Sequence, residues 1–344
     1  MNEYHDQLNF HLHKAFLSRF SLLDSTATNA IRLFNGFLEG DTRWVIELFG
    51  DTLVINDHLQ TEPDPEDANL IAQYYLEWHP TIKSVVLKQR YASQREDRHG
   101  KIIFGEKITT QVKEFSIRYA INLQLNQDSS FYLDTRYLRS WLLENVAGKS
   151  VLNTFAYTGS LGIAALAGGA EEVIQIDLNR RFLDLALLSC RLNDQPVQKM
   201  KLIANDFYRA IGNFKQSQKL FDCVILDPPF FSKTTAGRVD LVNESSRLIN
   251  KARPLVGHKG WLIFVNNALF FRGQEFIDLL EELCQDQYIA IDSIIPVPQD
   301  ITGYPDTIVS QPPVSVEPFN HSTKIVVLQV YRYDERPASK EINI

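Results

Sequence analysis

The stretch SVLNTFAYTGSLGIAALAGGAEEVIQIDL, from Ser150 to Leu178, decides the fold. It contains an apolar run, a glycine turn, a run of small apolar residues long enough for a helix, and a second apolar run. Strands that are apolar almost throughout are typical of a parallel sheet with helices on both faces. The stretch therefore predicts a strand–helix–strand unit.

The same alternation continues to the end of the chain. A helix is expected in RRFLDLALLSCRLN, which begins at Arg180. Further strands are expected in four apolar segments: MKLIAND (200–206), FDCVILDPP (221–229), GWLIFVNNA (260–268) and TKIVVLQVYRY (323–333). We therefore predict an α/β fold with a doubly wound, mostly parallel sheet, which binds ligands at the carboxyl ends of its strands.

We expect two domains. Residues 1–118 are predicted to form a helical segment and a smaller α+β domain, and residues 119–344 are predicted to form the domain that contains the doubly wound sheet. Apolar spacing near 3.6 predicts helix over 1–35, and Gly50-Asp51 predicts a hairpin between WVIELF and TLVIND. A Pro- and acid-rich turn (61–69) precedes an expected helix, LIAQYYLEW. Later expected elements are strands in SVVLKQR (84–90), KIIFGE (101–106), QVKEFSIRY (111–119) and AINLQL (120–125), then a strand end and helix in FYLDTRYLRSWLLENV (131–146).

Composition indicates a soluble globular protein of 344 residues, with 44% hydrophobic and 22% charged residues. No apolar run approaches the length of a membrane helix, and the polar N-terminus is not a secretory signal. Cys190, Cys223 and Cys284 are widely spaced and show no metal-ligand pattern. We expect a cytoplasmic protein without membrane or metal partners.

The charge is unevenly distributed. The net charge is −7, which argues against a protein coated in nucleic acid, yet residues 81–118 hold nine basic and four acidic residues. Such a patch can bind phosphates within an acidic chain. A solvated strand face explains the same charges, and both interpretations stay open.

Polar residues follow the expected strands. Thr158-Gly159-Ser160-Leu161-Gly162 forms the first turn, where glycine lets the backbone approach a ligand, although a tight structural turn has the same composition. The turn lacks the dinucleotide pattern GxGxxG. Asp177, 18 residues after Gly159, can bind both hydroxyls of a ribose, as found for NAD and for S-adenosylmethionine (SAM) alike. Asn205-Asp206 can hold an adenine amino group or can cap the next helix.

Asp227-Pro228-Pro229-Phe230 separates the two cofactors. Two prolines after a buried strand form a stiff, extended loop without backbone donors. The carboxylate and the loop carbonyls can then accept hydrogen bonds from a nucleobase, and Phe230 can stack on its ring. Hydride transfer has no need of such a loop, so the sequence favours methyl transfer from SAM.

Together these motifs resemble the SAM-dependent rRNA methyltransferases that modify bacterial large-subunit RNA. The similarity runs from about Ile31 to Tyr333 and includes NTFAYTGSLGIAALAGGA (153–170), FYLDTR (131–136) and the segment 32–57. It implies a class I methyltransferase fold with a seven-stranded sheet, SAM as cofactor and RNA, favoured as rRNA, as partner. DPPFFSK (227–233) and FVNNALFFRG (264–273) are closer to the family's guanine-N7 module than to its cytosine-C5 branch. Residues 1–30 show no counterpart of the small RNA-binding domain that opens the cytosine-C5 enzymes.

The resemblance also implies roles for individual residues. The target base is expected at Asp227, Pro228, Pro229 and Phe230, with Asn266 as a further candidate that a structural role also explains. Asp134 and Arg136 are candidates for the methionine carboxylate, although an ion pair between them explains them equally well. The remaining expected cofactor contacts are Asn153, Phe155, Tyr157, Thr158, Gly159, Asp177, Leu178, Asn205, Asp206 and Asp227.

The acceptor is predicted to be a guanine nitrogen. Methylation of pyrimidine carbon 5 needs a cysteine thiolate beside the base. The stretch after the fifth strand, Val265-Asn266-Asn267-Ala268, has no thiol. Two alternatives stay open: a methyltransferase of this fold that acts on DNA adenine or a small molecule, and a non-catalytic protein that binds SAM and RNA.

Overall fold

The computed structural model describes residues 3–23, 27–60 and 65–332. The predicted turn at 61–69 therefore lies partly outside the described residues. The chain divides into two compact units. Unit 1 comprises Met1–Ser140, Asp184–Gln195 and Val297–Pro313, and unit 2 comprises Trp141–Leu183, Pro196–Pro296 and Val314–Ile344. The predicted boundary between residues 118 and 119 does not coincide with this division.

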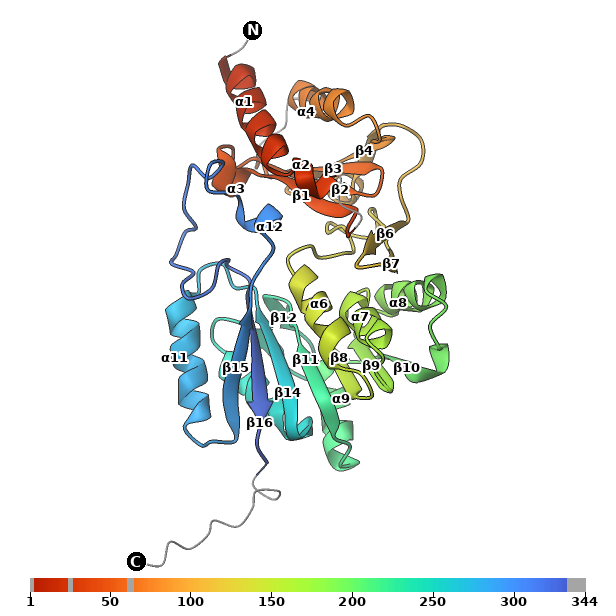
Figure 1. Ribbon diagram of the computed structural model, residues 1–344, viewed down its shortest axis with the longest axis vertical. Helices are drawn as coiled ribbons and strands as arrows, with labels where there is room; N and C mark the ends of the chain where they lie inside the picture. The colour runs from red at the N-terminus through yellow and green to blue at the C-terminus, as the bar shows by residue number, and fades with distance from the viewer. Residues whose placement is uncertain (1–2, 24–26, 61–64, 333–344) are drawn as a thin grey trace, which may run out of the picture. The chain divides into compact units, whose positions relative to one another are not determined.

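Unit 2 contains the predicted seven-stranded sheet, with strand order β10-β9-β8-β11-β14-β16-β15 (Figure 1). The first five strands in this order run parallel, and β16 is antiparallel to both of its neighbours. The bounds of the strands are β8 Ser150–Thr154, β9 Glu172–Asp177, β10 Met200–Ala204, β11 Phe221–Leu226, β14 Val256–Asn266, β15 Ile289–Ile295 and β16 Lys324–Val330. The predicted α/β fold class is confirmed.

Helices cover both faces of this sheet because the central strands carry apolar side chains on both faces. One face packs against α9, α10 and α11 through a single apolar core that includes Leu226 and Phe264. On the opposite face, α7 lies against β8 and β9. The helix bounds are α7 Ser160–Ala167, α9 Phe207–Gln216, α10 Ser245–Ala252 and α11 Gly273–Cys284. Helices α6 (Arg136–Asn145) and α8 (Arg180–Leu192) each contribute to both units, and the short hairpin of β12 (Phe231–Lys233) and β13 (Arg238–Asp240) follows β11.

The register of the parallel strands aligns their carboxyl ends. Leu226 at the end of β11 pairs with Thr154 of β8 and with Phe264 of β14. Asp177 at the end of β9 pairs with Ala204 at the end of β10. The residues that follow these strands therefore gather along one edge of the sheet, as a doubly wound fold requires of its ligand site.

Unit 1 contains a five-stranded sheet with strand order β1-β2-β3-β4-β5. Helices α1 and α4 pack on one face of it, and α4 connects the parallel pair β3 and β4 (Figure 1). The strands are β1 Ala30–Asn35, β2 Trp44–Phe49, β3 Thr52–Asp57, β4 Ser84–Gln89 and β5 Lys101–Phe104, with a separate hairpin of β6 Gln111–Glu114 and β7 Ile117–Ala120. The helices are α1 Glu3–Ser18, α2 Phe20–Leu23, α3 Gly36–Glu39, α4 Pro65–Trp78, α5 Arg95–His99 and α12 Gln299–Thr302.

Several local predictions in this unit need correction. Helix was predicted over 1–35, but Ala30–Asn35 forms strand β1, because it pairs with β2. QVKEFSIRY is a tight hairpin rather than one strand, since Phe115 and Ser116 adopt left-handed φ angles of 49° and 70°. AINLQL (120–125) forms no strand beyond Ala120, and 131–135 is turn rather than strand. The hairpin at Gly50-Asp51 and the helix at 70–78 are confirmed.

Candidate active site

The loop after β8 has a backbone that only a tightly held segment adopts. Phe155, Tyr157 and Gly159 all have left-handed φ angles, of 55°, 50° and 80°. Left-handed backbone is strained for residues other than glycine, so the surroundings must hold Phe155 and Tyr157 in place. Gly159 then begins α7. The loop thus keeps its shape at the carboxyl edge of the sheet.

Asp177 holds this loop. Its Oδ2 accepts the Tyr157 backbone N–H at 2.8 Å, and its Oδ1 accepts the Asn179 N–H at 2.8 Å. Burial raises the pKa of the Asp177 carboxyl above its ordinary value, although these backbone hydrogen bonds favour the charged form. Each carboxylate oxygen can accept a second hydrogen bond. Asp177 can therefore bind a diol while it fixes the loop.

Asn153, Gln175 and Gly162 form a buried polar contact beside the loop. Asn153 Nδ2 donates to Gln175 Oε1 at 3.1 Å, while Asn153 Oδ1 is buried without a hydrogen-bond partner among the described residues. A Cβ at Gly162 would come within 2.3 Å of the Gln175 side chain, so glycine lets α7 approach β9. The free acceptor on Asn153 is a group that a ligand can satisfy.

Asp206 is the N-cap of α9, as one interpretation of the sequence predicted. Its carboxylate accepts the Tyr208 N–H at 2.8 Å and the Thr234 hydroxyl at 2.6 Å. Next to it, the ring of Phe207 stacks on that of Phe155, with centroids 4.7 Å apart. Asn205 Oδ1 accepts the Asp206 N–H. The segments that follow β8 and β10 therefore contact each other at the carboxyl end of β9, the strand that lies between them.

The Asp227-Pro228-Pro229-Phe230 loop leaves the centre of the sheet. Asp227 is partly buried, Pro228 is buried, and Phe230 is 51% exposed. The Phe230 carbonyl accepts the Leu241 N–H at 3.2 Å, which ties the loop to the end of the β12–β13 hairpin. An acidic group at the base of a rigid loop and an exposed ring at its tip suit a planar, hydrogen-bonding substrate.

Asn266 is fully buried, and its amide is used within the protein. Its Nδ2 donates to the Leu241 carbonyl at 3.3 Å and to Ser245 Oγ at 3.1 Å, and its Oδ1 accepts the Ala268 N–H at 2.9 Å. We therefore interpret Asn266 as a residue that positions the surrounding loops rather than one that contacts a base.

Arg136 and Asp134 belong to unit 1. The Arg136 guanidinium is buried and donates to Asp300 at 2.7 and 3.0 Å and to Glu114 at 3.2 Å. Its ion-pair partners are thus carboxylates distant in sequence. This favours a structural role for Arg136, and a contact of Asp134 with a cofactor stays a prediction.

The basic segment 81–118 is only in part a solvated face. The Lys88 side chain is buried, and its Nζ donates to the carbonyls of Asn126, Gln127 and Asp128. Burial, with nearby Arg90, lowers the pKa of Lys88 to about 8. Arg90 itself pairs with Asp128 at 3.1 Å. Within the segment 81–118, Lys88 is therefore not available for a phosphate contact, because its charged group binds backbone carbonyls inside unit 1.

A family model described as "S-adenosylmethionine-dependent methyltransferase" matches residues 58–287. The chain belongs to this family. The methyltransferase has similar relatives among curated proteins. YwbD of Bacillus subtilis (strain 168), whose name contains the words "ribosomal RNA large subunit methyltransferase", is 26% identical over 340 residues, which cover 92% of this chain and 79% of YwbD.

Two further relatives match over shorter parts. "Ribosomal RNA large subunit methyltransferase K" of Neisseria meningitidis serogroup B is 31% identical over 192 residues, which cover 55% of this chain and 52% of the relative. For "Ribosomal RNA large subunit methyltransferase K/L" of Aliivibrio salmonicida, the identity is 26%, with 71% of this chain and 35% of the relative covered. The chain thus spans only about a third to a half of the length of these two relatives.

Solved structures confirm the fold. The crystal structure of SMU.776 complexed with SAH has a TM-score of 0.82 at 21% identity, with 95% of this chain and 82% of that chain covered. A SAM-dependent methyltransferase from Agrobacterium tumefaciens has a TM-score of 0.60 at 16% identity, with coverages of 90% and 91%. At these identities the comparison establishes the architecture alone.

SAM is the cofactor of this family, and the edge of the sheet in unit 2 fits it. The unsatisfied Asn153 oxygen, the second acceptor position on each oxygen of Asp177 and the left-handed loop at Gly159 are groups that can form polar contacts with an amino acid and a ribose. The sequence did not single out Gln175, Phe207 or Thr234, which contact Asn153, Phe155 and Asp206, respectively. A polar residue inside the apolar strand EVIQID was a signal for Gln175.

Asp177→Ala is expected to weaken SAM binding at least tenfold. The change removes two charge-assisted hydrogen bonds to the ribose, each worth about 1.5–3 kcal/mol, and releases the Tyr157 N–H that fixes the loop. Isothermal titration calorimetry measures the affinity. Glu172→Ala, at the opposite end of β9, is the matched control and should bind SAM like the wild type. Equal affinities of the two variants would contradict the assignment.

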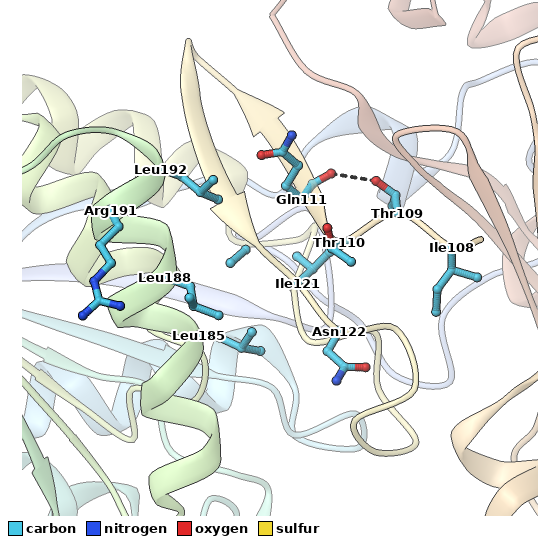
Figure 2. Close-up of a pocket in the computed structure, with 11 residues that line it drawn as sticks. Ile108, Thr109, Thr110, Gln111, Ile121, Asn122, Leu185, Leu188, Arg191 and Leu192 are labelled. Atoms are coloured by element: carbon cyan, nitrogen blue, oxygen red, sulfur yellow. Dashed lines mark hydrogen bonds between the residues drawn. The ribbon is translucent and has the colours of Figure 1, made fainter.

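Unit 1 has a separate cavity of about 590 Å³, which lies between the end of α8 and the segments 108–111 and 120–122. Leu185, Leu188 and Leu192 point from α8 toward Ile121, whereas Arg191 points away (Figure 2). Among the described residues that line the cavity, Arg191 is the one with a charge. The cavity lacks the acidic and aromatic groups that distinguish the edge of the sheet in unit 2.

Two negative findings complete the description. Within residues 3–23, 27–60 and 65–332, no helix combines the length and apolarity needed to cross a membrane. In the same part of the chain, no group of three or more His, Cys, Asp and Glu side chains could hold a metal ion.

Proposed function

We propose that this methyltransferase transfers a methyl group from SAM to a nitrogen of a nucleobase in ribosomal RNA, with guanine as the favoured base. The loop Asp227–Phe230 carries the proposal, because it places a carboxylate and an exposed ring at the end of β11, next to β8. The relatives' names, which specify large-subunit ribosomal RNA, support RNA as the substrate.

Each residue of the loop has its own role in holding the base. The Asp227 carboxylate accepts hydrogen bonds from base N–H groups, and the Phe230 ring stacks on the base. Pro228 and Pro229 keep the loop extended, so that little conformational freedom is lost on binding. Together they align the acceptor nitrogen for attack, which is the main requirement of this reaction.

Bound SAM supplies a methyl group on a positively charged sulfur, which is already activated toward a nucleophile. Asp177, Asn153 and the loop at Gly159 would hold SAM, and its methyl group would pass to the lone pair of the base nitrogen, with the sulfur as leaving group. A ring nitrogen such as guanine N7 carries no proton, so the transfer is complete without a base. This chain then needs to supply alignment and exclusion of water rather than proton transfer.

The cysteines support a nitrogen acceptor. Cys223 is buried within β11, and burial raises the pKa of its thiol to about 12. Cys190 is buried in α8, and Cys284 lies at the end of α11; burial raises the pKa of both thiols. A thiol with a raised pKa is a poor nucleophile at neutral pH. This argues against the thiolate addition that carbon-5 methylation requires.

Mass spectrometry of nucleosides tests the proposal. Ribosomal RNA from cells that lack the protein is incubated with enzyme and labelled SAM, and the expected product is an N-methylated guanosine. A variant with Cys190, Cys223 and Cys284 replaced by serine or alanine should retain the transfer. Label in carbon-5-methylated pyrimidine, or loss of all transfer by a cysteine variant that still folds and binds SAM, would contradict a nitrogen acceptor. Absence of label in any RNA would reject the proposed function itself.

A further inference from the structure

Two loops at the carboxyl edge of the unit 2 sheet have side chains of the same types in the same order. After β11 the chain reads Phe230-Phe231-Ser232-Lys233, and after β14 it reads Leu269-Phe270-Phe271-Arg272. Each loop therefore has large apolar residues followed by a cation. Phe231 is 56% exposed and Phe270 is 69% exposed. Other phenylalanines, such as Phe10 and Phe20, are also exposed, but Phe231 and Phe270 lie in loops that follow two paired strands, and each forgoes the roughly 1.5–3 kcal/mol that burial of a Phe side chain contributes.

The two loops are neighbours. Strands β11 and β14 are paired in parallel, so both loops leave the same edge. A chain of hydrogen bonds then connects them. Leu241 N–H donates to the Phe230 carbonyl at 3.2 Å, Asn266 Nδ2 donates to the Leu241 carbonyl at 3.3 Å, and Ala268 N–H donates to Asn266 Oδ1 at 2.9 Å.

Buried polar groups hold this connection in place. Ser245 Oγ donates to the Leu241 carbonyl at 2.6 Å, and Lys324 Nζ donates to the Ala268 carbonyl at 3.1 Å. Both residues are at most 1% exposed. Phe271, between Phe270 and Arg272, packs against the core of the unit. The exposed rings are therefore presented by anchored loops.

Within the part of the chain that the structure describes, the charged ends of the Lys233 and Arg272 side chains form no ion pair, although the Glu275 carboxylate accepts the Arg272 backbone N–H at 3.2 Å. By contrast, Arg238, which lies opposite Lys233 in the β12–β13 hairpin, pairs with Glu244 at 3.0 Å. Exposed rings next to unpaired cations match a ligand that has aromatic faces and negative charges in alternation.

We propose that these two loops bind the single-stranded RNA on either side of the target base. Phe231 and Phe270 stack on flanking bases, and Lys233 and Arg272 contact the phosphates between them. Only unpaired bases offer their faces to such rings, and the cations suit RNA better than an apolar protein surface. The inference rests on the proposed function and adds a recognition surface to it, with residues distinct from those that hold the target base.

Binding of a fluorescein-labelled, mixed-sequence single-stranded RNA of 12 nucleotides, followed by anisotropy, tests the rings. Phe270→Ala and Phe231→Ala should each weaken binding at least about fivefold, since one base stack contributes at least this much. Affinity for SAM should stay that of the wild type, which shows that the fold persists. Leu220→Ala is the control. It removes an exposed apolar side chain just before β11, at the opposite edge of the sheet, and should leave the affinity for RNA unchanged. Phe270→Trp keeps an aromatic ring at this position and should bind the RNA about as tightly as the wild type, unlike Phe270→Ala.

The salt dependence of the same binding tests the cations. The double variant Lys233→Gln, Arg272→Gln should reduce the slope of log affinity against log salt by up to about 1.4, or about 0.7 for each phosphate that the variant no longer binds. Wild-type affinity and slope in these variants would overturn the inference, and the proposed function would still stand if the wild-type enzyme methylates ribosomal RNA. Failure of the wild type to methylate any RNA would instead reject the proposed function.

Discussion

Replacement of Asp227 with alanine is expected to lower kcat/KM for RNA methylation about a hundredfold, while the protein still folds. The carboxylate follows a buried strand whose register with β8 and β14 fixes its position. Its loss removes a charged acceptor for the base, and the acceptor nitrogen then loses its alignment with the methyl group. Misplacement of reacting atoms by about 1 Å has an effect of this size. Initial rates with labelled SAM measure the change.

The same strand offers a control. Asp222, near the opposite end of β11, is exposed and accepts hydrogen bonds from Ser150 N–H and Oγ. Asp222→Ala removes a carboxylate of the same kind from the same strand and should leave kcat/KM within about twofold of the wild type, because Asp222 lies at the amino end of β11, away from the loop proposed to hold the base. If the two variants had equal activity, Asp227 would have no part in holding the base.

The architecture of unit 2 could be predicted because its central strands, such as β8, β9 and β11, are buried on both faces. Near-continuous apolar runs such as EVIQID and FDCVIL identify such strands without reference to the rest of the chain. Strand β15, IAIDSII, was not predicted. Asp292 and Ser293 interrupt its apolar pattern, and its pairing with β16 has a register shift there. β1 was likewise predicted as helix, because its six residues continue the apolar spacing of the helices before it.

The sequence predicts a site at the carboxyl edge of the sheet, but it does not predict which of the polar residues there bind a ligand and which stabilise the fold. A polar residue at a strand end serves a ligand or the fold, and the choice depends on partners far away in the chain. Arg136 and its partner Asp300 are 164 residues apart, and Asn266 and Leu241 are 25 apart. The left-handed backbone of Phe155 and Tyr157 was equally hidden, because its cause includes the contact with Asp177.

Glu114→Ala is expected to lower the free energy of unfolding of unit 1 by about 3–5 kcal/mol, the usual effect of removing one partner from a buried ion pair. The Glu114 side chain is fully buried and accepts hydrogen bonds from Arg136 Nε at 3.2 Å and from Arg139 Nε at 2.6 Å. Without it, Arg139, also fully buried, keeps only neutral acceptors, the Tyr132 carbonyl and the Thr135 hydroxyl, among the described residues. Urea unfolding followed by far-ultraviolet circular dichroism measures the loss.

Glu106 provides the comparison, because it is exposed and lies in the loop after β5. Glu106→Ala should change the free energy of unfolding by no more than about 0.5 kcal/mol. Arg136 retains Asp300 in the Glu114 variant, whereas Arg139 loses its acidic partner, so Arg139→Met in the Glu114→Ala background should recover part of the stability. Such recovery follows because an unpaired buried charge destabilises more than an apolar side chain of similar length. A Glu114→Ala variant as stable as Glu106→Ala would show that the buried carboxylate does not stabilise unit 1.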